Sequence, residues 1–142
     1  MSLAKKVINK MINGDAFSQW LGIEVLEISG GFCKLQMEVR KEMTNGFSIA
    51  HGGISYSLAD SCLAFASNSY GIQSVSIETS ISHTKKVESG DILIATSKEI
   101  NKTTKTALYY ITITNQKNEK IAHFRGTVFR TEKKWYSEKV LI

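Results

Sequence analysis

Residues 53–70 have apolar side chains on most sides of a predicted helix, and this feature constrains the fold more than any other. One apolar set follows helical spacing and consists of Ile54, Leu58, Cys62 and Phe65. Small or apolar residues cover much of the remaining circumference, namely Ala59, Leu63, Ala64 and Ala66. A helix that is apolar on most sides is usually buried. The rest of the chain must therefore supply a layer that surrounds this helix, which is expected to end near Gly71.

That layer is predicted to be a β-sheet, because β-branched residues are abundant after Gly71. Four strands are expected at about 73–85, 91–101, 105–115 and 120–130, with turn-forming residues between them. Two earlier strands are expected at 23–29 and 32–40, and Gly30-Gly31 between them is typical of a hairpin. Residues 41–50 are polar and contain glycine, which indicates a loop. A run of antiparallel strands with one helix indicates an α+β fold.

The whole chain, residues 1–142, is predicted to form a single domain, because it has no proline, no internal repeat and no low-complexity segment. A short helical segment is expected at 4–20, and Gly14-Asp15 interrupts it. Asp15 could cap a second helix there. The C-terminal tail, 133–142, is mixed in character, and its apolar residues Trp135, Val140 and Leu141 are expected to pack on the domain or on a partner chain.

Charge and composition argue against several functions. The net charge is +5, but the basic residues are scattered, so a nucleic-acid partner is not expected. A polyanionic small molecule would equally favour a basic pocket mouth. No apolar run approaches the roughly 20 residues that span a bilayer, and the N-terminus lacks the apolar core of a signal peptide. Cys33 and Cys62 form no metal-binding pattern, so no metal and a reducing, cytoplasmic location are predicted.

The segment that carries chemistry runs from Asn45 to Asp60 and contains His51-Gly52-Gly53. Two adjacent glycines at a loop-to-helix junction allow another group to approach the backbone closely. A helix N-terminus also presents unpaired N–H groups with a partial positive charge. The Gly53 N–H is therefore the candidate donor of an oxyanion hole. Asp60 lies among apolar and small residues, where a carboxylate is costly to bury unless it is paired or functional.

Gly53 and Asp60 are seven residues apart, which is about 10 Å along a helix. On one straight helix they are too far apart to act on the same carbonyl, so the spacing predicts a site built from two subunits. Simpler interpretations of the same residues also exist. They are a hinge at Gly52-Gly53, a solvated Asp60, a helix-capping or core His51, and a turn at Asn45-Gly46.

His51-Gly52-Gly53, followed after six residues by Asp60, resembles the PaaI-like (phenylacetate-degradation) branch of hotdog-fold acyl-CoA thioesterases. The resemblance covers roughly residues 14–131. It continues through Ala64, Asn68 to Gly71, Ser89-Gly90-Asp91 and Gly126 to Phe129. It implies the hotdog fold, in which a six-stranded antiparallel sheet curls around one long central helix. It also implies a homodimer with two composite sites, usually paired further into a tetramer.

The resemblance also implies roles for individual residues. Asp60 matches a nucleophile or a general base for water, and Gly53 matches the oxyanion donor. His51 and Asn45 match polar residues that shape or polarise the thioester end, and Ser67 matches a hydroxyl that positions water. Further substrate contacts are expected from Gly52, Phe47, Tyr56, Lys85, Lys86, Lys102 and Lys105, with the lysines near the phosphates of coenzyme A. Relatives commonly carry proline in the stretch matching 84–87 and arginine or glycine in the 102–105 turn, and this chain has neither.

The predicted reaction is hydrolysis of an acyl-CoA thioester to a free acid and coenzyme A, which is part of the substrate, so no separate cofactor is expected. Tyr56, Phe47 and Phe65 could line a pocket for a medium-chain or aryl acyl group such as phenylacetyl. Two alternatives are a hydratase or dehydratase on the same scaffold and a non-catalytic module that binds acyl-CoA. His83 and His123 fall within predicted strands and are interpreted as structural or surface residues.

Overall fold

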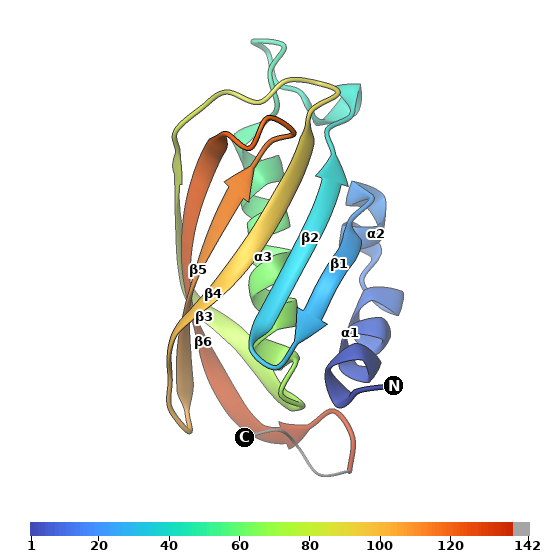
Figure 1. Cartoon of the computed structure of the whole chain (residues 1–142), viewed down its shortest axis with the longest axis vertical. Helices are drawn as coiled ribbons and strands as arrows, with labels where there is room; N and C mark the ends of the chain where they lie inside the picture. Colours follow the sequence, from blue (N-terminus) through green and yellow to red (C-terminus); the bar gives the residue numbers. More distant parts are fainter. Residues whose placement is uncertain (138–142) are drawn as a thin grey trace.

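The computed structural model describes residues 1–137, and its central feature is a six-stranded antiparallel sheet (Figure 1). The strands lie in the order β1-β2-β4-β5-β6-β3. Their bounds are Glu24–Ser29 for β1, Phe32–Glu38 for β2, Ile72–His83 for β3, Ile92–Lys102 for β4, Thr106–Thr114 for β5 and Lys120–Lys134 for β6. All six predicted strands are therefore confirmed.

The sheet curls around helix α3, Gly52–Asn68, which contacts β2, β3, β4, β5 and β6 (Figure 1). Helix residues on more than one side are buried, among them Leu58, Leu63 and Phe65. Each such large apolar side chain contributes about 1.5–3 kcal/mol to folding. Helix and sheet approach closely at Gly126, where a Cβ atom would lie 2.5 Å from Leu63 Cδ2. The expected α+β hotdog fold with a buried central helix is confirmed.

Two short helices precede the sheet and lie beside its β1 edge (Figure 1). Helix α1, Leu3–Asn13, buries Ala4, Val7 and Ile8 and packs against α3 and β1. Helix α2, Ala16–Leu21, begins after Asp15, whose side chain accepts a hydrogen bond from Ser18 N. The predicted capping role of Asp15 is thus confirmed. In the loop between β2 and α3, a single 3-10 turn forms at Lys41–Met43.

Strand β6 continues four residues beyond the predicted limit of 130, because β3 pairs with it as far as Ile72 opposite Lys134. Trp135 then packs on the domain, where its indole Nε1 donates to Asn68 Oδ1 at 2.8 Å. The expected packing of Trp135 is therefore confirmed. Val140 and Leu141 lie outside the described residues.

The two edges of the sheet differ. Strand β1 is short, its register shifts between Val25 and Glu27, and Glu24 and Glu27 are exposed. Strand β3 has 12 residues, and its exposed apolar side chains include Ile77, which is 60% exposed. Because β3 pairs with β6 on one side only, its other edge carries unpaired backbone groups within the described chain.

Candidate active site

Asp60 lies in the middle of α3, half-buried, and opens onto a cavity of about 270 Å³ between the helix and β3. The cavity wall also includes Ser67, which lies two helical turns after Asp60, and Ser74 and Ser76 from β3. Apolar side chains complete the lining, namely Leu63, Ala64, Val75 and Val128. The structure thus places Asp60 and Ser67, two site residues implied by the family resemblance, in the wall of the same cavity.

The environment of Asp60 favours its protonated form. Burial raises the pKa of this carboxyl above its usual value, and the nearby charge of Asp15 raises it further. Among residues 1–137, no charged side chain other than Asp60 lines the cavity. A half-buried carboxylate without a counter-charge is a stronger base or nucleophile than an ordinary aspartate, as catalytic carboxylates often are.

The N-terminus of α3 is closed by the ring of His51. His51 is the N-cap residue, and its Nδ1 accepts a hydrogen bond from Gly53 N at 2.9 Å. The Gly53 N–H, the predicted oxyanion donor, is therefore occupied in this structure. Within residues 1–137 the neighbouring Gly52 N–H makes no hydrogen bond. The capping interpretation of His51 is confirmed, and the helix start offers one free amide at Gly52.

The loop before α3 is shaped by Asn45. Its Oδ1 accepts from Phe47 N at 2.9 Å and from Ile49 N at 3.4 Å, so the turn interpretation of this residue is also confirmed. Phe47 projects from the loop and is 85% exposed. Because Oδ1 is used within the loop, the side-chain NH₂ of Asn45 is the group that could reach a ligand.

A second cavity, of about 380 Å³, lies beside the start of α3. Its lining includes Asn45, Gly52, Ser55, His83, Lys85 and Lys86. A methyl group placed on Gly52 would lie 3.2 Å from His83 Nε2, so the two residues are in close contact. His83 is exposed, as predicted, but it also adjoins the candidate oxyanion donors. No local motif links it to Gly52, because the two residues are far apart in the sequence.

The two cavities share no lining residue. One protomer therefore holds Asp60 and Ser67 in one place and Asn45, Gly52 and His51 in another. A single chain does not bring the two predicted halves of the site together, which agrees with the spacing of Gly53 and Asp60 along the helix.

Of the three aromatic residues predicted to contact the acyl group, two are placed where they could do so. Tyr56 is partly buried, its hydroxyl bonds to Thr79 Oγ1, and its ring packs edge-on against Phe124 at 5.5 Å between centroids. Phe47 is exposed beside the helix start. Phe65, in contrast, is 1% exposed and belongs to the core, so its predicted place in a pocket is wrong.

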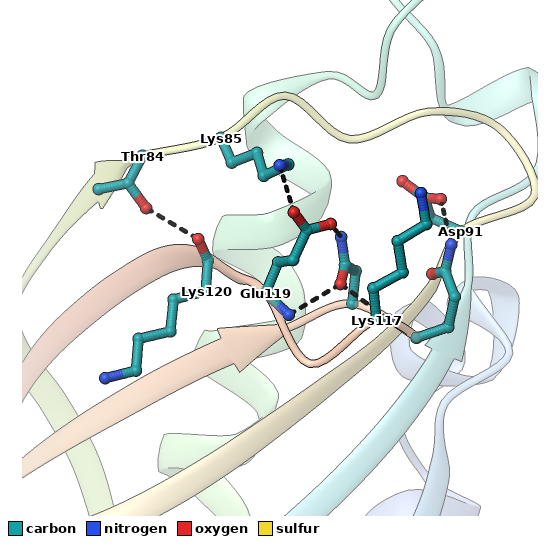
Figure 2. Close-up of polar contacts among 8 residues, drawn as sticks. Thr84, Lys85, Asp91, Lys117, Glu119 and Lys120 are labelled. Atoms are coloured by element: carbon teal, nitrogen blue, oxygen red, sulfur yellow. Dashed lines mark hydrogen bonds and ion pairs between the residues drawn. The ribbon is translucent and has the colours of Figure 1, made fainter.

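Lys85 and Lys86 are both engaged in ion pairs. Figure 2 shows Lys85 reaching Glu119, with Nζ 2.5 Å from Oε2, and Glu119 in turn accepts from Asn115 Nδ2. Lys86 Nζ lies 3.4 Å from Glu88 Oε1. The Lys85 pair lowers the pKa of Glu119. Both lysines therefore already have an acidic neighbour.

Lys102 and Lys105 line a third and larger cavity, an open groove of about 1000 Å³. Arg130 and Lys133 lie in the same groove, and Glu132 is its one acidic residue among those described. Lys102 Nζ sits 3.8 Å from the centre of the Tyr70 ring, and the Tyr70 hydroxyl donates to Glu99 at 2.7 Å. Burial and the nearby Glu99 raise the pKa of Tyr70 to about 12. The groove therefore presents a net positive surface at the opposite end of the sheet from Gly52.

Comparison with known proteins identifies the family. Residues 47–122, slightly more than half of the chain, match the model of the thioesterase superfamily. The chain belongs to this superfamily and is a thioesterase. A putative esterase from Archaeoglobus fulgidus is 39% identical over 90% of this chain and 83% of its own length.

Two further relatives are more informative about chemistry. The acyl-coenzyme A thioesterase PaaI of Escherichia coli is 36% identical over 84% of this chain and 86% of its own length. The structure of E. coli PaaI, a protein from the phenylacetic acid degradation operon, matches with a TM-score of 0.91 over 93% of this chain and 96% of that one, at 33% identity. A protein from Streptococcus mutans, solved bound to acetyl CoA, matches with a TM-score of 0.76 at 27% identity over 79% of this chain and 90% of that one. The predicted resemblance to PaaI is confirmed. In residues 1–137, no helix is both long and apolar enough to cross a membrane.

Proposed function

We propose that this protein hydrolyses acyl-CoA thioesters to a free acid and coenzyme A. The observation that carries the proposal is Asp60, a half-buried carboxylate in a cavity that also contains Ser67 and to which the described residues contribute no counter-charge. Two relatives support the substrate class, because one is named an acyl-coenzyme A thioesterase and another was solved with acetyl CoA.

The complete site forms between two protomers that pair through the free edge of β3. Full antiparallel overlap of two copies of β3 sets Ile72 opposite the partner's His83. Because His83 adjoins Gly52 in its own chain, this pairing carries the start of one helix α3 toward the other protomer's Ser74, in the wall of the Asp60 cavity. A two-fold axis then repeats the arrangement, which gives two sites per dimer.

The amides at the start of α3 hold the thioester oxygen. Gly52 N–H is free to donate, whereas Gly53 N–H can contribute only when the His51 ring releases it. The NH₂ group of Asn45 is the second polar group available to polarise the carbonyl. These donors stabilise the negative charge that develops on the oxygen in the transition state.

Asp60 supplies the attack by one of two routes. As a general base it takes a proton from water, the hydroxide adds to the carbonyl carbon, and the coenzyme A thiolate leaves and is then protonated. As a nucleophile it attacks the carbonyl itself, the thiolate leaves, and water hydrolyses the resulting anhydride. Ser67 Oγ donates to Ala64 O at 3.2 Å, so its lone pairs are available to hold that water. A single turnover in ¹⁸O-labelled water separates the routes, because only the nucleophilic one places label in Asp60.

The coenzyme A phosphates bind in the groove of Lys102 and Lys105 in preference to the Lys85–Lys86 loop. Lys85 and Lys86 would have to share their charge with Glu119 and Glu88, while the groove holds four cations against one acid among the residues described. The acyl group lies near Tyr56 and Phe47, which suits a medium-chain or aryl group. The unpaired thiols of Cys33 and Cys62 are compatible with a cytoplasmic location.

The test is release of free thiol from a panel of short, medium-chain and aryl acyl-CoAs. The wild type is expected to release thiol, and Asp60→Ala is expected to lose about 100–10,000-fold in kcat while keeping its fold by circular dichroism. Thiol release also separates hydrolysis from hydration of an enoyl-CoA and from binding without turnover. Wild-type rates in Asp60→Ala would remove the proposed mechanism.

A further inference from the structure

Three polar side chains connect α2 to the face of α3 beside Asp60. Asp15 Oδ2 accepts from Ser18 Oγ at 2.6 Å, and Ser18 Oγ lies 2.8 Å from Ser61 Oγ. Ser61 directly precedes Cys62 and directly follows Asp60 in the helix. We propose that Asp15 is a positioning residue for Asp60, which holds a negative charge beside the turn of α3 that carries the catalytic carboxyl. This inference rests on the proposed function for its kinetic consequence only.

The arrangement is more than a helix cap. Capping requires only the bond from Ser18 N to Asp15 Oδ1, which is 2.9 Å long. The second oxygen of Asp15 makes an additional, short bond to the Ser18 hydroxyl, and hydrogen bonds to an ionised acceptor are typically short and strong. Ser18 is 1% exposed, so the Ser18 end of this link is shielded from water, and the bond as a whole is partly buried. It fixes the charged end of α2 against the turn of α3 that carries Asp60.

Asp15 is also the only charged group among residues 1–137 that is seen to act on Asp60. The cavity that Asp60 lines is formed by residues of α3, β3 and β6, and among those described none except Asp60 is charged. From the other side, α2 presents Asp15, whose charge adds to the effect of burial in raising the pKa of Asp60. Because no cation compensates, removing the Asp15 charge should lower the pKa of Asp60.

The test compares Asp15→Asn with Ser18→Ala in the full-length protein. Asparagine caps helices as well as aspartate does, so Asp15→Asn removes the charge and keeps the bond from Ser18 N. The acid limb of the kcat/KM–pH profile, which reports ionisation of Asp60, is expected to move to lower pH. Ser18→Ala keeps both the charge and the capping bond from the backbone N–H of residue 18 to Asp15, so its acid limb is expected to stay near that of the wild type even if its melting temperature falls. An acid limb in Asp15→Asn that coincides with the wild-type limb overturns the proposal.

A second readout does not depend on turnover. The Asp60 carboxyl carbon can be titrated by NMR in ¹³C-labelled protein and assigned from the signal that is missing in Asp60→Asn. A lower pKa in Asp15→Asn supports the inference even if no thioester is hydrolysed, and an unchanged pKa contradicts it even if hydrolysis is fast.

Discussion

At the scale of single residues, the two adjacent glycines at the start of α3 are not equivalent. Gly53 N–H is held by the His51 ring, whereas Gly52 N–H has no partner within the described residues. Both amides belong to the first turn of the helix, so sequence spacing alone cannot separate them. The difference depends on the direction of one imidazole ring, which places its Nδ1 2.9 Å from the Gly53 nitrogen.

Replacement of Gly52 by proline tests the free amide directly. Proline suits the first position of a helix, and His51 already has the extended conformation that a following proline requires, with φ −61° and ψ 136°. Gly52→Pro should lose about 100–1,000-fold in kcat, as expected for one oxyanion donor. Gly52→Ala introduces the same contact with His83 but keeps the N–H, so it is the matched control and should lose much less. If both variants lose the same amount of kcat, the loss comes from the steric contact with His83 and not from the missing N–H group.

Asp60 should lower stability at neutral pH. Its folded-state pKa is raised, so the folded protein binds the proton more tightly than the unfolded chain, and the stability from this residue is lost as the pH rises through the folded pKa. Asp60→Asn imitates the protonated carboxyl and should unfold at higher urea concentration than the wild type near neutral pH. The difference should vanish near pH ~3, where both states of the wild type are protonated. A less stable Asp60→Asn at neutral pH would contradict the assigned cause.

At the scale of secondary-structure elements, the type of each predicted element was correct and the errors were in faces and ends. Alternation along β3 could not identify its inward face, because the register shifts between Ser76 and Glu78. Even-numbered Ser74 lines the Asp60 cavity, whereas odd-numbered Thr79 contacts Tyr56 of the helix. Phe65 was misplaced for a related reason, since a helix that is apolar on most sides does not reveal which side faces a cavity.

Asn68 joins the end of α3 to β3 and to Trp135, which directly follows β6. Its Nδ2 donates to Ala64 O at 2.8 Å and Ser74 O at 3.0 Å. Its Oδ1 accepts from Ser74 N at 2.9 Å and Trp135 Nε1 at 2.8 Å. The side chain is 1% exposed, so every hydrogen-bonding position of the amide is used without water.

Asn68→Ala should therefore destabilise the protein by about 2–4 kcal/mol, because the groups that it satisfies remain buried. Urea unfolding at neutral pH measures the change. Trp135→Phe removes one bond only and should cost about 1 kcal/mol. If both variants lose the same stability, the junction depends on Trp135 packing and not on the amide.

At the scale of the whole molecule, the sequence predicts a helix surrounded by a sheet and a site that needs a second chain. It does not predict how the two parts of that site, the start of α3 and the Asp60 cavity, come together. The spacing of seven positions from Gly53 to Asp60 indicates that they are separated along the helix axis. Contact between Gly52 and His83 arises only after β3 has folded back along α3. The ion-pair partners of Lys85 and Lys86 could likewise not be predicted from the sequence. Glu119 lies on a turn that is distant in the sequence from Lys85, and the pairing of Glu88 with Lys86 depends on the loop conformation.

Mixed dimers test whether the site is shared. Asp60→Ala and Gly52→Pro protomers, each inactive alone, place an intact Asp60 opposite an intact Gly52 in one of the two sites of a mixed dimer. After co-refolding in equal amounts, half of the dimers are mixed, so activity should return to about one quarter of the wild type. Asp60→Ala refolded with itself controls for contamination. No recovery in purified, doubly tagged mixed dimers would mean that each site lies within one chain.

The difference between the two sheet edges also limits how far the sheet can be extended by strands from other chains. A long, apolar free edge such as β3 is a template on which other strands can add, and in many proteins such edges seed fibres. The opposite edge is a poor site for adding a further strand, because β1 is short, irregular in register, rich in acidic side chains and flanked by α1. Strand pairing between copies of this chain can therefore join two protomers through their β3 edges, and it then stops because neither copy has a second long, regular edge. In the proposed dimer the edge of β3 is covered in both protomers, so the strand that could start fibre growth is no longer free.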